Sequence, residues 1–278
     1  MDLIVTLQCK DQPGIVHAMT TSVLESRGNI IENQQFTDPT TNDFVMRTRF
    51  ETASTLEEVK KILGNGLGRF NPTLNFRPAT TKKRALVLVT KESHCLRDLL
   101  YLQELGELPI EIPAVISNHS ELKSLTQTHN IKYIDQSALD KDISEAQLRE
   151  LISKENIDLI ILARYMQILS TQFCKDFAGK IINIHHSFLP GFKGAKPYHQ
   201  AHDRGVKIIG ATAHFVTADL DEGPIIDQDV AHVSHAATPE DLIATGRDIE
   251  RRVLSRAVKD FAEDRIFIVG EKTVVFRN

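Results

Sequence analysis

The richest group of chemically capable side chains lies at residues 183–194, which read Asn-Ile-His-His-Ser-Phe-Leu-Pro-Gly-Phe-Lys-Gly. The segment begins where a short apolar run ends, and it continues into a loop rich in proline and glycine. If the strand conformation persists through Ile184, Asn183 and His185 project from one face, because strand side chains alternate with a period of two. An amide beside an imidazole can stabilise an oxyanion formed at a carbonyl, and a histidine can pass a proton to a leaving nitrogen. The segment is therefore a candidate site for chemistry at a carbonyl carbon.

A second polar group lies at residues 219–224, which read Asp-Leu-Asp-Glu-Gly-Pro between two strand-like runs. Asp221 is a natural partner for His185, since a carboxylate can hold the proton of an imidazole or activate a water molecule through it. We therefore take Asn183, His185 and Asp221 as the candidate catalytic residues. These three side chains define a site, but they do not by themselves identify a reaction.

Plainer interpretations exist for the same residues. Asn183 could satisfy backbone groups at a strand end, and Asp221 could be an ordinary turn residue in a solvated acidic loop. Seven of the eleven histidines lie between residues 185 and 235, which raises the question of a metal. His199 and His202 are three residues apart, but no His-Glu-x-x-His or Cys-x-x-Cys pattern accompanies them. We therefore expect no metal.

The elements that must position these residues alternate between strand and helix from residue 85 onward. Short and almost unbroken apolar runs occupy residues 85–89, 110–116, 157–162 and 181–184. Such runs are typical of strands buried on both faces of a parallel sheet, and helical patterns lie between them. Two further strands near 208–216 and 225–233 precede a long amphipathic helix at about 239–261, and a terminal hairpin is expected at 266–276. The pattern predicts a doubly wound α/β domain, in which ligands gather at the carboxyl ends of the strands.

The first eighty residues have a different rhythm. Strand-like runs and helical stripes follow one another in the order β-α-β-β-α-β, which is the ferredoxin-like pattern of an α+β domain. The polar stretch Thr80–Arg84 has no periodicity and is interpreted as a linker. We therefore expect two domains, at residues 1–80 and 84–278.

Composition excludes several functional classes. No apolar run is long enough to span a membrane, and a net charge of −4 gives no general attraction to nucleic acid or anionic lipid. The three cysteines, Cys9, Cys95 and Cys174, are odd in number and far apart, which is no disulfide framework. Because the start also lacks the features of a signal peptide, we expect a cytoplasmic protein.

Several motifs in order resemble the folate-dependent formyltransferase family. They are Asn-Ile-His at 183–185, Gly-Ala-Thr-Ala-His-Phe-Val at 210–216, Asp-Glu-Gly-Pro-Ile-Ile at 221–226 and Ala-Arg-Tyr-Met-Gln-Ile-Leu at 163–169. The resemblance covers most of residues 85–265 and implies a formyltransferase-type fold there. It also implies that the asparagine, histidine and aspartate at positions 183, 185 and 221 form the catalytic trio.

The same resemblance implies a folate pocket. Its residues would be Arg164, Met166, Ile168, Leu169, Cys174, Ile181, Ala218, Asp219 and Leu220. For Met166, Ile168 and Leu169, plain core packing is the alternative. No cofactor is expected beyond the folate substrate, 10-formyltetrahydrofolate.

Two departures separate the chain from the transferring members of the family. Transferases that act on a glycinamide ribonucleotide carry a glycine-rich turn after the first strand, where the acceptor's phosphate binds. Here residues 90–95 contain no glycine, and Glu92 would oppose an anion. The residue after the catalytic histidine is typically proline in transferases, whereas this chain has His186. Together with Lys193–Gln200, His186 is similar to family members that hydrolyse the formyl group.

These features imply hydrolysis of 10-formyltetrahydrofolate to formate and tetrahydrofolate, which would supply formate for purine synthesis and balance the one-carbon pools. Two alternatives remain: transfer of the formyl group to an amine acceptor, and a catalytically idle sensor of folate or amino acids.

The N-terminal segment Asp11–Val16 resembles an ACT domain, a module that commonly binds amino acids and pairs across subunit interfaces. The resemblance implies an amino-acid effector near Asp11, Gly14 and Asn29, and a homo-oligomer such as a dimer or tetramer. A purely oligomerising role is the alternative, because ferredoxin-like units often pair edge strands.

Overall fold

The computed structural model describes residues 1–191 and 197–277, and the chain divides into two compact units. One unit comprises residues 1–82 together with 263–278, and the other comprises residues 83–262. The Lys-Gly-Ala-Lys part of the motif at 193–200 lies outside the described residues.

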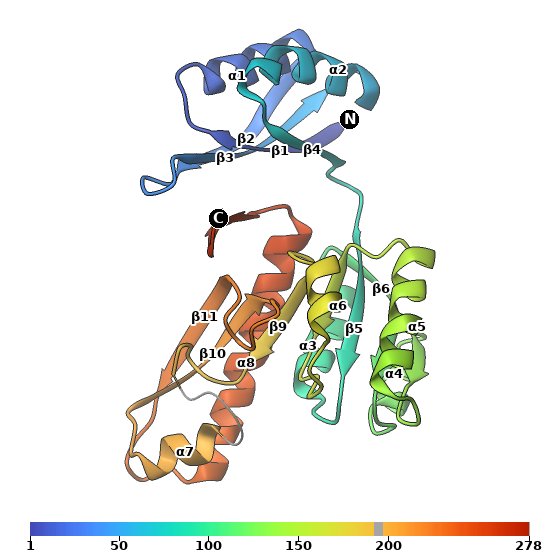
Figure 1. The fold of residues 1–278 in the computed structure, drawn as a ribbon, viewed down its shortest axis with the longest axis vertical. Helices are drawn as coiled ribbons and strands as arrows, with labels where there is room; N and C mark the ends of the chain where they lie inside the picture. Colours follow the sequence, from blue (N-terminus) through green and yellow to red (C-terminus); the bar gives the residue numbers. More distant parts are fainter. Residues whose placement is uncertain (192–196, 278) are drawn as a thin grey trace. The chain divides into compact units, whose positions relative to one another are not determined.

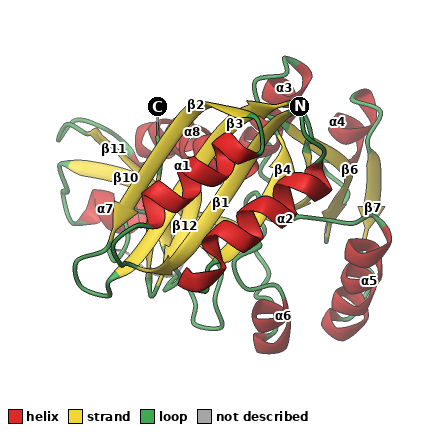
Figure 2. Cartoon of the chain, turned by 90° about the horizontal axis from the view of Figure 1, so that it is seen from above, coloured by secondary structure: helices red, strands yellow, loops and turns green. Residues whose placement is uncertain are grey.

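The first unit has the element order predicted from the sequence. Its elements are β1 (Asp2–Lys10), α1 (Ile15–Glu25), β2 (Gly28–Thr37), β3 (Asp43–Thr52), α2 (Leu56–Leu67), a short 3₁₀ turn at Gly68–Phe70 and β4 (Thr73–Pro78). The strands form an antiparallel sheet in the order β2-β3-β1-β4, and α1 and α2 lie side by side across one of its faces (Figure 2). Helix α2 begins with a capping box in which Thr55 and Glu58 satisfy each other's backbone N–H groups.

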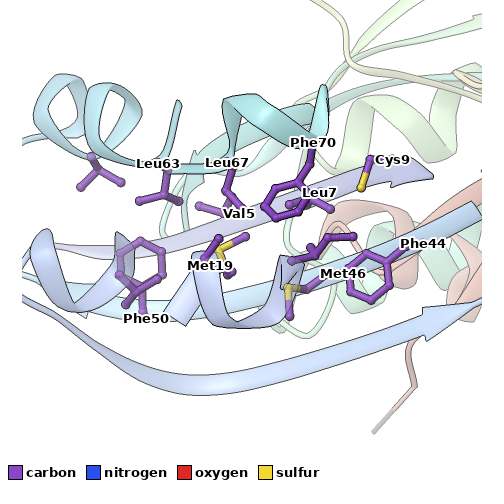
Figure 3. Close-up of a cluster of buried hydrophobic side chains, with 14 of the residues drawn as sticks. Val5, Leu7, Cys9, Met19, Phe44, Met46, Phe50, Leu63, Leu67 and Phe70 are labelled. Atoms are coloured by element: carbon purple, nitrogen blue, oxygen red, sulfur yellow. The ribbon is translucent and has the colours of Figure 1, made fainter. Parts of the chain in front are cut away.

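The core of this unit lies between its two helices and its sheet (Figure 3). Val5 and Leu7 point inward from β1 because strand side chains alternate, and Met19 of α1 and Leu63 of α2 pack on them. All four side chains are fully buried. This burial of apolar surface is the main stabilisation of the unit.

The opposite face of the same sheet is covered by the C-terminus of the chain. Strands β12 (Ile266–Val269) and β13 (Lys272–Val275) form an antiparallel hairpin. Phe267, Val269 and Phe276 pack on Val45 of β3. A side-chain amide of Gln8 on β1 donates to the carbonyl of Ile268 at 3.0 Å.

A buried group of charges fixes the start of this C-terminal segment. The side chain of Arg47 is only 2% exposed, donates from Nε to the carbonyl of Glu263 at 3.0 Å and pairs with Glu32 at 3.0 Å. Arg265 pairs with the same carboxylate at 2.9 Å. Burial alone would raise the pKa of Glu32, but the two guanidinium groups outweigh it and hold the pKa below its usual range.

The domain boundaries therefore differ from those expected. The sequence indicated one domain over residues 84–278, whereas residues 263–278 pack with the N-terminal unit. The hairpin was expected from its sequence, but its packing partner was not, because that partner is a sheet face more than two hundred residues away along the chain.

The second unit is an α/β structure around a seven-stranded mixed sheet of order β11-β10-β9-β8-β5-β6-β7. Its parallel strands are β5 (Lys83–Val89), β6 (Ile110–Ser117), β7 (Lys132–Asp135), β8 (Leu159–Leu162) and β9 (Ile181–His185). Strands β10 (Ile208–Phe215) and β11 (Ile225–His232) run antiparallel. Its helices are α3 (His94–Glu104), α4 (Lys123–Thr128), α5 (Lys141–Lys154), α6 (Thr171–Asp176), α7 (Pro197–Asp203) and α8 (Pro239–Ala262).

Helices cover both faces of this sheet, as the unbroken apolar strands predicted. Side chains of α5 and α6 pack with Leu86, Leu88 and Leu162 on one face, and α8 crosses β9 and β10 on the other, where it also packs against α3 (Figure 1). Short β7 was not recognised in the sequence. No helix in the described part of the chain is both long and apolar enough to cross a membrane.

The packing of the C-terminal hairpin generates a prediction. Replacing Phe267 with alanine removes a ring that is 6% exposed and should lower the free energy of unfolding of the first unit by about 3 kcal/mol. Hydrogen–deuterium exchange of the β1 and β3 amides reports the stability of the first unit separately from that of the second. The control change Leu24→Ala, at a side chain 74% exposed on α1, should shift stability by no more than about 0.5 kcal/mol. Equal protection of β3 in both variants would contradict the role of the hairpin.

Candidate active site

A cavity of about 690 Å³ opens in the second unit at the carboxyl ends of β8 and β9. Leu162, the last residue of β8, and His185, the last residue of β9, both line it. This is the edge of the sheet at which open α/β folds bind ligands. Asn183, His185 and Asp221 all line the same cavity, so the three residues singled out by sequence are brought together.

Hydrogen bonds and charge hold the three side chains in fixed relation. Asp221 Oδ2 lies 3.2 Å from Nδ1 of His185, and both side chains are largely buried. Burial alone would raise the pKa of Asp221, but the contacts of the carboxylate with His185 and His214 together outweigh the burial and hold the pKa below its usual range. Nε2 of His185 is buried and has no hydrogen-bonding partner among the described residues. Its hydrogen-bonding capacity is thus unmet, in a residue that lines the cavity.

His214 completes the group and was missed as a site residue. It stands directly opposite Asn183 in the β9–β10 pairing, and its Nε2 lies 3.2 Å from the Asn183 amide nitrogen and 3.6 Å from Asp221. Its Nδ1 donates to the carbonyl of Phe215 at 2.9 Å, so Nε2 is the acceptor for the Asn183 amide. The pairing register of β10 with β9 was the missing information, because the sequence alone does not specify it.

The turn that carries Asp221 is tight. Asp221 itself has a left-handed backbone conformation, with φ of 57°, which costs a non-glycine residue energy and is often found at functional sites. Gly223 packs so closely that a Cβ there would lie 1.7 Å from the carbonyl oxygen of Phe215. The glycine is thus required by the close approach of the turn to β10.

The expected folate residues form a mainly apolar wall of the cavity. Of the nine, eight line it: Arg164, Met166, Ile168, Leu169, Cys174, Ala218, Asp219 and Leu220. Ile181 does not, because it is fully buried in the core beneath. Met166 is 58% and Ile168 67% exposed, so core packing does not explain them, whereas Leu169 belongs to the core as well. Exposed apolar side chains around a cavity are typical of a ligand site.

A polar wall lines the same cavity, and Glu92 and His186 are the two of its residues that the sequence had singled out. It consists of Glu92, His94, His186, Tyr198, Arg247 and Glu250. Glu250 on α8 is 1% exposed and accepts hydrogen bonds from Tyr198 Oη at 2.6 Å and from His94 at 2.8 Å. The sequence offered no signal for a buried glutamate in the middle of an amphipathic helix.

Two residues of this wall, His94 and Glu250, belong with buried Cys95 to a group of side chains with metal-ligating chemistry. Ligand atoms of His94, Cys95 and Glu250 lie within 4.8 Å of one another, whereas His199 and His202 form no such group among the described residues. Burial raises the pKa of the Cys95 thiol well above its usual value, which opposes the thiolate form that binds metals. Glu250 is also already engaged by Tyr198.

The residues expected to bind an effector lie in the first unit, at two separate places. Asp11 accepts a hydrogen bond from Thr37 at 3.1 Å, at the end of β2, and Gly14 precedes α1 in a left-handed conformation. Asn29 lies at the opposite end of β2. It is about 26 Å from Thr37, because each strand residue advances the chain by about 3.3 Å. Within one chain, Asn29 therefore does not share a site with Asp11 and Gly14, because seven strand residues lie between it and Thr37.

Comparisons with known proteins agree with the fold of the second unit. The formyl transferase family model matches residues 83–258. The chain is 44% identical to a formyltetrahydrofolate deformylase of Corynebacterium sp. (strain P-1), over 99% of this chain and 98% of that protein. It is 45% identical to the protein of that name from Bacillus subtilis (strain 168), over 97% and 92%.

Solved structures give the same result. A formyltetrahydrofolate deformylase from Burkholderia mallei matches with a TM-score of 0.95 and 42% identity, covering 99% of each chain. A glycinamide ribonucleotide transformylase from Symbiobacterium toebii matches with a TM-score of 0.67 and 31% identity, covering 74% of this chain and 98% of that one.

The Asp221 turn generates a prediction that concerns folding. Gly223→Ala should lower the free energy of unfolding of the second unit by about 1–3 kcal/mol, because the added carbon overlaps the Phe215 carbonyl. Chemical denaturation measures the change. Gly64→Ala, where a Cβ meets nothing within 4 Å in helix α2, should instead be neutral or slightly stabilising. A Gly223→Ala protein as stable as Gly64→Ala would show that the turn can relax.

Proposed function

Since the chain belongs to the formyltetrahydrofolate deformylase family, we propose that Asn183, His185 and Asp221 carry out its hydrolysis of 10-formyltetrahydrofolate. The products are formate and tetrahydrofolate, and a role in supplying formate for purine synthesis and in balancing one-carbon pools fits the family. The observation that carries the assignment is the His185–Asp221 pair, in which His185 lines the cavity and has a buried Nε2 without a hydrogen-bonding partner among the described residues.

The trio provides what hydrolysis of a formamide needs. A water molecule attacks the formyl carbon and passes a proton to the His185–Asp221 pair, while the carbonyl oxygen becomes an oxyanion. Asn183 donates one amide hydrogen to His214, so its second amide hydrogen is free for that oxyanion. The His185 imidazolium adds charge stabilisation. The proton then goes to N10 as the C–N10 bond breaks, so that water's hydroxyl ends on formate and its hydrogen on tetrahydrofolate.

The negative charge of Asp221 supports both steps. Its lowered pKa keeps the carboxylate ionised throughout the neutral pH range, so it can stabilise a positive charge on His185 as the proton arrives. His214 holds the Asn183 amide in the donating orientation, since its Nε2 accepts the other amide hydrogen. In this proposal the chain needs no cofactor beyond the folate substrate.

The apolar wall is proposed to bind the folate. Met166, Ile168 and Leu220 are exposed around the cavity and suit the aromatic rings of a pterin and an aminobenzoyl group. The backbone of residues 218–220 offers polar groups beside them. The loop that holds Met166 is anchored where the Met166 N–H donates to Thr90 at 2.9 Å.

We also propose that residues 1–80 are an ACT-type module that binds an amino acid or joins copies of the chain. The element order and the sheet order support this assignment. Ile31 and Phe36 are 50% and 43% exposed on the edge strand β2, which is favourable for contact with a second copy. Three buried cysteines without disulfides fit the reducing cytoplasm as the place of action.

The central test is release of formate and tetrahydrofolate from 10-formyltetrahydrofolate without any amine acceptor. We expect prompt turnover by the unmodified protein. Asn183→Ala should lower kcat about 10²–10³-fold through loss of an oxyanion donor, and Asp221→Asn about 10²–10⁴-fold through loss of acid–base support. Both variants should keep binding tetrahydrofolate.

Asp248→Asn is the control, because this carboxylate is 66% exposed on the surface of α8, and its kcat should not change. Near-normal turnover by Asp221→Asn would remove that carboxylate from the mechanism. Tight folate binding without turnover by the unmodified protein would point to a missing amine acceptor.

The ACT assignment is tested separately by equilibrium dialysis of the full chain with glycine and with methionine. Binding of either amino acid, weakened by Asp11→Ala, is expected for an effector site. Absence of binding of both amino acids would favour the purely oligomerising role of residues 1–80.

A further inference from the structure

We propose that four side chains, Glu250, Tyr198, His94 and Arg164, close the α8 side of the cavity against an amine acceptor and so make water the nucleophile. We call these residues the Glu250 cluster. The inference rests on the proposed hydrolysis, and it assigns the choice of nucleophile to residues outside the catalytic trio.

The cavity crosses the edge of the sheet from one face to the other. Its apolar wall includes Leu169 and Cys174, which pack with α5 and α6 on one face. Its polar wall is built by His94 of α3 and Glu250 of α8, on the opposite face. The trio lies at the sheet edge, within the same cavity. A folate on the apolar side would therefore leave the α8 side as the approach for a second substrate.

Glu250 holds the side chains on the α8 side of the cavity in place. Its buried carboxylate accepts from Tyr198 and His94, and the Arg164 guanidinium lies 3.4 Å away. Burial alone would raise the pKa of Glu250, but the hydrogen bond from His94 and the charge of Arg164 hold it below its usual value. The carboxylate is thus ionised, and displacing its partners would leave a buried charge poorly compensated. Such a loss is strongly unfavourable.

Two backbone positions, Arg164 and Gly246, have unusual features that accommodate the side chains of the cluster. Arg164 has a left-handed conformation with φ of 62°, a strained state for a non-glycine residue. Gly246 lies one helical turn before Glu250, and a Cβ there would be 2.1 Å from the phenol oxygen of Tyr198. A glycine inside a helix costs about 1 kcal/mol relative to alanine, and here it makes room for the Tyr198 ring.

His186 joins the cluster to the trio. Its ring lies 5.2 Å from the ring of His185 and 6.1 Å from that of Tyr198. A continuous row of rings therefore runs from the catalytic histidine to α8. Burial, and next the charge of Arg164, lower the pKa of His186 to about 4, so the ring is neutral at physiological pH and offers an acceptor to water.

The charges of the polar wall are matched internally. Arg247 pairs with Glu92 at 3.1 Å, and Arg164 pairs with Glu250. Both arginines that line the described part of the cavity thus face a carboxylate. A phosphorylated acceptor would have to displace Glu92 from Arg247, which opposes its binding.

The test is the partition of the formyl group between water and an added amine. Radiolabelled 10-formyltetrahydrofolate is turned over in the presence of glycinamide, and formate and formylglycinamide are separated. In transfer, the amine nitrogen bonds to the formyl carbon, the C–N10 bond breaks, and one amine proton goes to N10. The unmodified protein should give formate only.

Tyr198→Ala opens the wall without touching the trio and should raise the ratio of formylglycinamide to formate about tenfold or more, as expected when a steric barrier in a pocket is removed. Tyr198→Phe keeps the ring but removes the hydrogen bond to Glu250, so it should raise the ratio less than Tyr198→Ala does. Tyr101→Ala, at a tyrosine 57% exposed on α3, is the matched control and should leave both products unchanged. Tyr198→Leu replaces Tyr198→Ala if circular dichroism shows that the alanine variant does not fold.

An opened variant that still releases formate, but no more formylglycinamide than the control, overturns the inference and leaves the proposed function intact. Absence of formate release by the unmodified protein overturns the proposed function itself, together with the inference. Transfer that rises in Tyr101→Ala as much as in Tyr198→Ala also overturns the role of the cluster.

Discussion

The ionised carboxylate of Asp221 is the charge on which the arrangement of the catalytic cavity depends. It faces His185 at 3.2 Å and His214 at 3.6 Å, and His214 in turn orients Asn183. Burial would favour a neutral carboxyl group, and the two histidines together offset it and lower the pKa of Asp221. That placement needs a strand that ends at residue 185 and a turn tight enough to require Gly223. The sheet, the turn and the glycine therefore serve one electrostatic arrangement.

Much of this site could be predicted from the sequence, because it depends on local rules. The period of a strand put Asn183 and His185 on one face, and an acidic turn between two strands indicated Asp221. His214 and Glu250 could not be found in the same way. His214 depends on the register between two antiparallel strands, and Glu250 depends on which face of a long helix meets α3. Both are properties of tertiary packing, which local pattern does not specify.

The fold shows the same division between local and distant information. The β-α-β-β-α-β order and the buried parallel strands followed from apolar periodicity and turn residues. The assignment of residues 263–278 to the first unit did not, since it depends on Arg47 and Val45 meeting the far end of the chain. Arg47 reads in sequence as an ordinary surface residue of a strand. Its burial becomes understandable only when Glu32, Arg265 and the hairpin are present around it.

The C-terminal hairpin has a consequence for the order in which the protein is made. Residues 1–82 leave the ribosome first, but the sheet face that carries Val45 stays uncovered until Phe267 and Phe276 have been synthesised. The second unit, continuous over residues 83–262, can acquire all its strands before that moment. The first unit to be translated is therefore the last to be finished, and Val45 and Arg47 on its open sheet face lack their packing and hydrogen-bonding partners during nearly the whole of translation.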